Sequence, residues 1–205
     1  MSHFVITIGR GYGSGGRTVG EMLAKRLGVE YYDRDLVRLA SDASGIHVDY
    51  FGNVDEQVKK RRLFGHRKNK VVGPDSPEYL SEDNLFELQA KTIREVAERE
   101  SCIIVGRAAD YVLRDNPDVV RVFVHAPFEY CVQVLEERYG MPERDAKRVI
   151  REIDDARSRY YRVHTGNEWT DARNYDLCLN SARLGFDRCV DAIIAHMKVR
   201  GIDVE

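Results

Sequence analysis

The amino-acid sequence predicts an α/β protein in three layers, with a parallel β-sheet between two layers of helices. Short apolar runs of strand length recur along the chain. They are too apolar to leave one face in water, which indicates strands buried on both faces. Amphipathic helical segments separate these runs, and the connecting loops are short, as in chains that build parallel sheets.

The first strand is predicted at residues 3–8, where four of the six residues are apolar. Helical spacing of apolar residues begins near Thr18, and Gly28 stands where a left-handed C-cap belongs. A second helix is predicted over residues 35–43. Residues 45–81 show little periodic pattern and include a basic run at residues 59–70, so we expect an inserted lobe there.

The remainder of the chain alternates between helices and buried strands. Strands are predicted at residues 101–105, 119–124 and 176–179, and helices at residues 83–100, from Pro127 onward, at 143–161 and around 186–197. This order places each strand end next to a loop that leads into a helix. Ligands of open α/β sheets bind at the edge formed by the carboxyl ends of the strands.

Composition and charge indicate one soluble globular domain. The chain has 205 residues, and its 32 Lys and Arg nearly balance 34 Asp and Glu, for a formal net charge of −2. This balance disfavours a nucleic-acid partner. No apolar run approaches the length of a membrane helix, and the four cysteines lie far apart. We therefore expect a cytoplasmic protein without a membrane partner; the oligomeric state stays open.

The segment GRGYGSGGRT, residues 9–18, joins the first strand to the first helix and carries the strongest chemical signal. Its five glycines allow close approach of backbone to a ligand, and the helix start offers unpaired N–H groups to an anion. With Gly11 as the first glycine, the segment fits the phosphate-binding P-loop pattern, with Arg17 where Lys is usual and Thr18 facing Mg²⁺. The alternative is a glycine-rich turn without a ligand.

Beyond this loop, the chain resembles the cytidylate kinases and, more closely, the cytidylate kinase-like proteins of the nucleoside monophosphate kinase group. The resemblance covers nearly the whole length, in the order GSGGRT, LGVEYYDRDL, IIVGRAADYVL, PDVVRVFVHAP, DDARSRYYR and YDLCLNS. It implies a single P-loop kinase domain over residues 1–205 with a parallel sheet of about five strands. It also implies an acceptor-binding lobe at about residues 45–81 and a lid at about 143–172.

The resemblance further implies an enzyme that moves the γ-phosphoryl group of ATP to a nucleoside monophosphate, with CMP or dCMP as first choice and Mg²⁺ as cofactor. The donor phosphates would contact Gly11, Gly13, Ser14, Gly15, Gly16, Arg17 and Thr18, and Thr18 would hold the metal. The acceptor would contact Asp33, Arg107 and Arg151. The catalytic cations would be Arg17, Arg107, Arg157 and Arg162.

The chain departs from the family pattern at three positions. Aligning GSG with GSG puts Gly16 where the phosphate-gripping lysine stands, while Val105 and Ala108 replace acidic residues near the end of a strand. Two alternatives stay open. One is a nucleotide-binding regulatory protein with little catalysis, and the other is a kinase of another small metabolite.

Several residues also have purely structural interpretations. Asp33 stands where it could cap a helix, and Arg107 could pair with Asp110 or Asp115. The lid arginines could pair with acidic neighbours on their own helix, and the basic run at 59–70 could be a solvated face. For the metal, Ser14 is an alternative to Thr18, with Asp33 or Asp110 acting through water. The aromatic residues Tyr160, Tyr161 and Trp169 could stack on a base or pack the lid.

Overall fold

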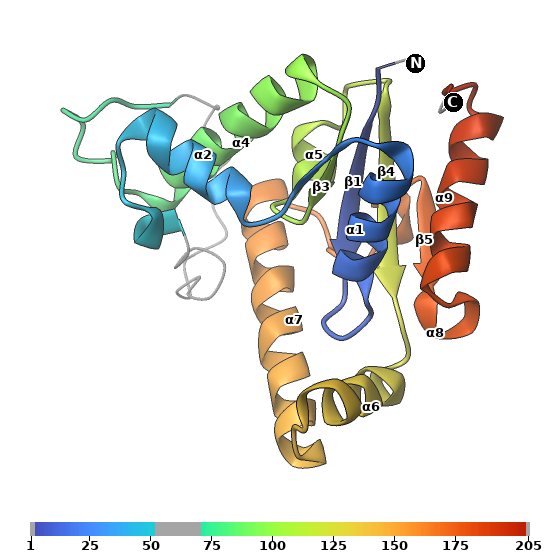
Figure 1. The fold of residues 1–205 in the computed structure, drawn as a ribbon. Coiled ribbons are helices and arrows are strands. Elements are labelled where there is room, and N and C mark those ends of the chain that lie inside the picture. The colour runs from blue at the N-terminus through green and yellow to red at the C-terminus, as the bar shows by residue number, and fades with distance from the viewer. Residues whose placement is uncertain (1–2, 52–70, 204–205) are drawn as a thin grey trace.

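A parallel five-stranded sheet lies at the centre of the computed structural model, which describes residues 3–51 and 71–203 (Figure 1). The strands are β1 (Val5–Arg10), β2 (Glu30–Tyr32), β3 (Cys102–Val105), β4 (Val119–His125) and β5 (Leu177–Asn180), in the order β2-β3-β1-β4-β5. Central β1 pairs on both sides, with Val5 opposite Cys102 and Val119. All carboxyl ends therefore meet at one edge of the sheet.

Helices cover both faces of this sheet, as predicted. Helices α1 (Gly16–Leu27) and α9 (Phe186–Val199) lie on one face, and α4 (Glu82–Arg99) and α5 (Ala109–Val112) lie on the other. Alternating side chains of β1 enter two separate apolar clusters: Ile6 and Ile8 pack on the α1 side, and Val5 packs on the α4 side. The strand is buried on both faces, which explains its nearly continuous apolar run.

Helix α2 (Asp35–Ser44) packs on α4, and the two form a lobe beside the sheet (Figure 1). The Tyr79 hydroxyl donates to the Ser44 carbonyl at 2.5 Å, which fastens the segment before α4 to the end of α2. The described parts of the segment predicted as an inserted lobe, residues 45–51 and 71–81, lie between α2 and α4 in the sequence. Its basic run at residues 59–70 lies outside the described residues.

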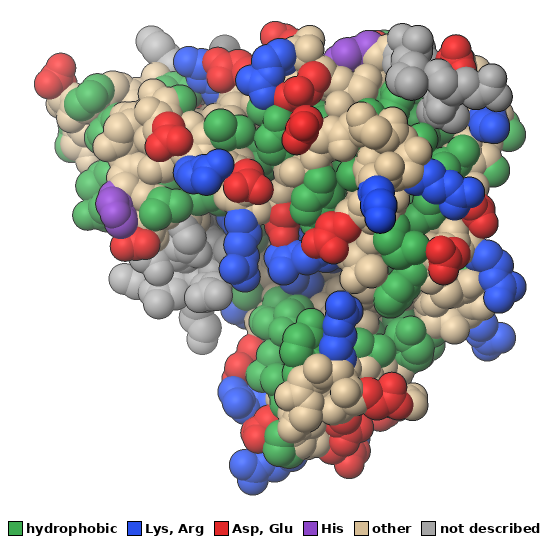
Figure 2. Space-filling model, viewed as in Figure 1, with side chains coloured by type: hydrophobic (Ala, Val, Ile, Leu, Met, Phe, Trp, Pro, Cys, Tyr) green, Lys and Arg blue, Asp and Glu red, His purple; other side chains and the backbone are tan. Residues whose placement is uncertain are grey.

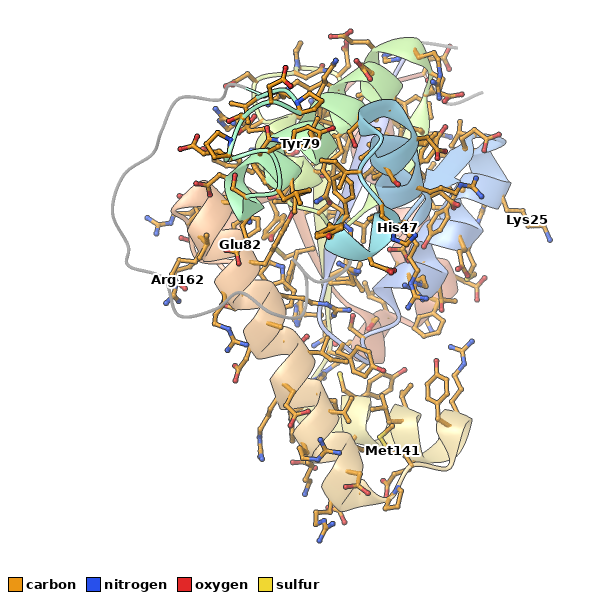
Figure 3. The ribbon with its side chains drawn as sticks, turned by 90° about the vertical axis from the view of Figure 1, so that its left-hand side faces the viewer. Lys25, His47, Tyr79, Glu82, Met141 and Arg162 are labelled. Atoms are coloured by element: carbon orange, nitrogen blue, oxygen red, sulfur yellow. The ribbon has the colours of Figure 1, made fainter. Side chains whose placement is uncertain are left out.

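Helices α6 (Phe128–Tyr139) and α7 (Glu143–Thr165) project beyond the carboxyl edge of the sheet (Figure 1). They pack on each other through a small apolar cluster of their own, which includes Leu135 and Ile150. Figure 3 shows Met141 at the tip, where α6 turns into α7. At its other end α7 buries Tyr160 and Tyr161 in the main core, so the projection is anchored at its base.

The remaining elements are the 3-10 helix η1 (Ala172–Asn174) and α8 (Ser181–Leu184), which immediately follows β5. Within the described ranges, none of the helices combines the length and apolar character that crossing a bilayer requires.

The structure places β2 where the sequence pattern showed no strand. This edge strand has only three residues, Glu30, Tyr31 and Tyr32, and none is fully buried, so no apolar run marks it. The four strands predicted from apolar runs are confirmed with shifts of one or two residues. The charged helix predicted to end at residue 161 continues to Thr165 and ends at Gly166 in the left-handed conformation.

A pair of glycine substitutions tests the packing at the start of α1. Gly15 and Gly45 have nearly equal φ angles of 77° and 74°, but a Cβ at Gly15 would lie 2.3 Å from the Phe186 ring, whereas a Cβ at Gly45 meets no described atom within 4 Å. Gly45→Ala should cost about 1 kcal/mol of unfolding free energy from backbone strain alone. Gly15→Ala should cost about 1–3 kcal/mol more because of overpacking. Urea unfolding measures both, and equal losses would contradict this packing.

Candidate functional site

A cleft of about 730 Å³ opens at the carboxyl edge of the sheet, between the glycine loop, the end of β3 and the α6–α7 pair. Figure 2 shows a hollow between the main body and the projecting helices, with basic side chains gathered in it. Its lining includes six arginines, Arg10, Arg17, Arg34, Arg107, Arg138 and Arg157, and four acidic residues, Glu21, Asp33, Asp110 and Glu152. Because cations outnumber carboxylates, the cleft favours an anionic ligand.

The glycine loop between β1 and α1 forms one wall of this cleft. Ser14 is fully buried, and its hydroxyl lies within hydrogen-bond distance of the Gly11 carbonyl, 2.8 Å, and the Val124 carbonyl, 3.0 Å. The Ser181 hydroxyl donates to the Ser14 carbonyl at 2.6 Å. These bonds fix the loop to β4 and α8. They also turn the Ser14 hydroxyl away from the cleft, so the structure does not support Ser14 as a metal ligand.

Helix α7 holds the loop from the opposite side. The Tyr12 backbone N–H donates to the Asp154 carboxylate at 2.8 Å. Arg157 donates to the Arg10 carbonyl at 3.1 Å, and its guanidinium lies over the Tyr12 ring. The conformation of the glycine loop therefore depends on α7 as well as on the sheet.

The structure separates the predicted lid arginines. Arg157 lines the cleft beside the glycine loop, whereas Arg151 lies over the Phe128 ring, 5.1 Å from its centre, and Arg162 pairs with Glu168. Neither Arg151 nor Arg162 belongs to the cleft lining, and Figure 3 shows Arg162 on the outer side of α7. Neither residue pairs with an acidic neighbour on α7, because Phe128 belongs to α6 and Glu168 follows the end of α7. The pairing within the helix is observed for Arg157, which lies 3.4 Å from Asp154.

Asp33 lies directly after β2 and is 8% exposed. Its carboxylate pairs with the guanidinium of Arg17 and lies 3.9 Å from Nη2 of Arg10. The residue that precedes the first turn of α2 is Arg34, so Asp33 is not the helix cap that the sequence allowed as an alternative. Instead, one carboxylate faces two cations at the mouth of the glycine loop.

The chain turns sharply after β3. Gly106, Arg107 and Ala108 follow one another in the left-handed conformation, with φ angles of 78°, 59° and 51°. For the two non-glycine residues this conformation costs on the order of 1–2 kcal/mol each. Such strain is typical of ligand-binding turns, and here it brings Arg107 into the cleft lining.

Asp110, three residues after Arg107, is a buried acidic residue. Asp110 is 6% exposed and accepts a hydrogen bond of 2.6 Å from the Tyr161 hydroxyl. Burial raises the pKa of Asp110 to about 6, although the bond from Tyr161 opposes this rise. Tyr160, Tyr161 and Trp169 are all buried in the α4-side core and also belong to the cleft lining, so their positions are compatible with packing at the base of α7 and with a contact to a bound base.

The donor set of the cleft fits a magnesium ion held mainly by phosphate. Among the described residues there is no cluster of three or more His, Cys, Asp and Glu side chains that could cage a metal. Mg²⁺ needs only one or two protein oxygens when phosphates and water complete its shell. Thr18, in the first turn of α1, lines the cleft and supplies one such oxygen, and Glu21 lines it one turn later.

Arg10 is the main residue that sequence reasoning missed. It ends β1, and its Cβ lies 2.4 Å from where a Cβ on Gly16 would stand. Only glycine therefore fits at position 16 beneath the Arg10 side chain. This is a physical reason why the chain has glycine where the family pattern has lysine. The signal available from the sequence was the place of Arg10 at the carboxyl end of a buried strand, the same signal that identified Arg107.

Comparison with known proteins gives consistent matches. The profile of a family described as the cytidylate kinase-like family matches residues 5–183. A cytidylate kinase from Methanopyrus kandleri is 27% identical over 191 residues, which cover 89% of this chain and 87% of that protein. The family profile includes the glycine loop, the β3 turn and most of the cleft lining.

Solved structures with the same fold include an uncharacterized protein from Eubacterium ventriosum, at 24% identity and a TM-score of 0.71, which covers 95% of this chain and 98% of that one. Shikimate kinase from Bacteroides thetaiotaomicron has 16% identity and a TM-score of 0.55, with coverage of 95% and 98%. A gluconokinase from Sinorhizobium meliloti has 15% identity and a TM-score of 0.52, with coverage of 96% and 92%. The expected P-loop kinase fold is confirmed.

The raised pKa of Asp110 predicts a pH dependence of stability. The ordinary pKa is 3.8 and the folded value is about 6, so the folded chain holds this proton more tightly. The resulting stabilisation is complete below pH 4 and is lost as the pH rises through 6. Asp110→Asn should remove this dependence, so the unfolding free energy of the wild type relative to the variant should fall by about 2 kcal/mol between pH 4 and 7.

Urea unfolding at a series of pH values measures this difference. Asp115→Asn is the matched control, because the Asp115 side chain is 88% exposed and its removal should leave the pH dependence unchanged. A difference between wild type and Asp110→Asn that stays constant from pH 4 to 7 would contradict the raised pKa.

Proposed function

Because this chain belongs to the cytidylate kinase-like family, we propose that it transfers the γ-phosphoryl group of ATP to a nucleoside monophosphate, with CMP or dCMP as the preferred acceptor. The observation that carries the proposal is that the glycine loop and Arg107 line the same cleft. Phosphoryl transfer requires little covalent participation by the protein. It requires two phosphate groups held in line and their charge neutralised.

The glycine loop forms the donor side. Backbone N–H groups at the start of α1 and the positive end of its dipole attract the β- and γ-phosphates of ATP. Arg17 is half-exposed at this point and pairs with Asp33, so its guanidinium needs only a rotation about its own side chain to reach a phosphate. Thr18 would hold Mg²⁺, which would neutralise charge on the donor phosphates.

Arg107 and Asp33 form the acceptor side. In this proposal Arg107 binds the phosphate of the acceptor, because the strained turn after β3 directs it into the cleft. A guanidinium suits this role since it donates two parallel hydrogen bonds to a phosphate. Asp33 orients the acceptor and holds Arg17, and Arg157 adds positive charge near the glycine loop. The roles expected for Arg151 and Arg162 stay predictions from the family resemblance.

The structure gives a reason for the departure at Val105 but none for the departure at Ala108. Val105 is fully buried in the apolar cluster under α1, where a carboxylate would lose its hydration without gaining a partner. Ala108 is 4% exposed within the strained turn. Neither position supplies a metal ligand here, so the proposal assigns the metal to Thr18 and the substrate phosphates.

A coupled assay of ADP release with a panel of acceptors tests this function. Turnover should depend on Mg²⁺ and should be fastest with CMP or dCMP. Turnover only with a hydroxyl-bearing metabolite would identify a kinase of another class. Nucleotide binding without turnover of any acceptor, and without a Mg²⁺ requirement, would favour the regulatory protein and contradict the proposal.

Arg107→Ala tests the acceptor side. Loss of a charge-assisted hydrogen bond costs about 1.5–3 kcal/mol, so kcat/KM for the acceptor should fall by about 10- to 150-fold. KM for ATP should change much less. Arg114→Ala is the control, since Arg114 lies on the Tyr111 ring and outside the cleft lining. An equal rise in KM for both substrates would contradict the assignment of Arg107 to the acceptor.

A further inference from the structure

We propose that Arg10 is a catalytic residue that spans the donor and acceptor sides of the cleft and contacts the phosphoryl group as it is transferred. The inference rests on the proposed phosphoryl transfer and adds a residue that the glycine-loop pattern does not include. In that pattern, G-x-x-x-x-G-K, a glycine ends the strand and a lysine begins the helix. With Gly15 as the second glycine, Arg10 occupies the place of the first glycine and Gly16 that of the lysine.

The structure supports this register, because α1 begins at Gly16 and Arg10 ends β1. A Cβ on Gly16 would lie 2.4 Å from Cβ of Arg10 and 3.1 Å from its Cγ. Real Cβ atoms do not approach this closely, so a side chain fits at position 10 or at position 16 but not at both. The two positions therefore exchange roles: the cation stands on the strand at Arg10, and the first residue of α1, Gly16, carries no side chain.

The other end of the Arg10 side chain reaches the turn after β3. Its Nη1 lies 2.2 Å from where a Cβ on Gly106 would stand, and its Cζ lies 3.0 Å away. The guanidinium therefore packs directly on Gly106, next to Arg107. The Cβ and Cγ of Arg10 pack on Gly16, the first residue of α1, and the guanidinium lies on Gly106, next to Arg107. This one side chain therefore spans the donor and acceptor sides of the cleft.

The surrounding charges favour an anion at this head group. Nη2 of Arg10 lies 3.9 Å from Asp33, whose carboxylate also pairs with Arg17. The carboxylate of Asp154 also acts on Arg10. Positive charge is still in excess around this head group, because six arginines and only four acidic residues line the cleft. A phosphoryl group that moves from the α1 side to the Arg107 side would meet Arg10 on its path.

The position of Arg10 is well defined. Its side chain is 17% exposed, and its own carbonyl accepts a hydrogen bond from Arg157. A cation fixed before the substrates bind stabilises developing charge without the cost of reorganisation. We therefore expect Arg10 to act more strongly on the transition state than on the binding of either substrate.

Kinetic analysis of Arg10→Met and Arg10→Lys tests this role. Methionine keeps much of the packing volume and removes the charge, so kcat should fall by about 100-fold or more while KM for each substrate changes by less than about 5-fold. Lysine should recover part of the lost kcat. Arg38→Ala on α2, with a side chain 71% exposed, is the control and should match the wild type. An unchanged kcat in Arg10→Met would overturn the proposal.

A second variant protects the test against misfolding. Gly16→Ala leaves Arg10 in the chain but forces its stem to move, so kcat should fall as in Arg10→Met. Guanidinium ion at millimolar concentration should restore part of the activity of Arg10→Ala, which a purely structural role would not allow. Absence of rescue, together with wild-type kcat in Gly16→Ala, would also overturn the proposal.

Calorimetry with inorganic tripolyphosphate separates this inference from the proposed function. If the wild type turns over no acceptor but binds tripolyphosphate more tightly than Arg10→Met does, by about 2- to 5-fold, the phosphoryl-transfer function fails and the phosphate contact of Arg10 stands. If the wild type turns over nucleoside monophosphates and Arg10→Met equals it in kcat and in tripolyphosphate affinity, the function stands and the role of Arg10 fails.

Discussion

The cleft depends on one close packing contact, between Arg10 at the end of β1 and Gly16 at the start of α1. With no side chain at position 16, the Arg10 stem crosses the first turn of the helix and the guanidinium rests on Gly106. The left-handed turn after β3 leaves room for that head group and directs Arg107 into the same space. A larger residue at position 16 or 106 would disturb both sides of the cleft together.

Helix α7 links this edge of the sheet to the projecting lobe. Through Asp154 and Arg157 it holds the backbone of the glycine loop, and through Tyr161 it contacts Asp110 in the core. Burial raises the pKa of both carboxyl groups. A movement of α6 and α7 would therefore reach the phosphate-binding loop directly, because the bonds that define the loop on this side belong to the moving helix.

Most of the fold could be predicted because its central strands are buried on both faces and leave long apolar runs, as at residues 3–8 and 119–124. The edge strand β2 leaves no such run and was missed. Within the cleft, Arg17 and Arg107 could be predicted because each directly follows a glycine at a strand end or helix start. Arg10 also follows a glycine at a strand end, but the proposed role was not predicted, because it depends on contacts with Gly16 and Gly106 that lie outside the glycine-loop pattern. The same limit applies to the lid: helical spacing does not reveal which arginine faces the glycine loop, and only Arg157 among those expected lines the cleft.

A crystal structure of the chain with ADP and CMP bound together would show whether one cleft holds both phosphate groups and whether Arg10 lies between them. We expect the β-phosphate of ADP at the N-terminus of α1, the CMP phosphate on Arg107, and the Arg10 guanidinium within hydrogen-bond distance, about 2.7–3.2 Å, of a phosphate oxygen. Phosphates bound away from the glycine loop, or an Arg10 side chain turned out of the cleft, would contradict this arrangement.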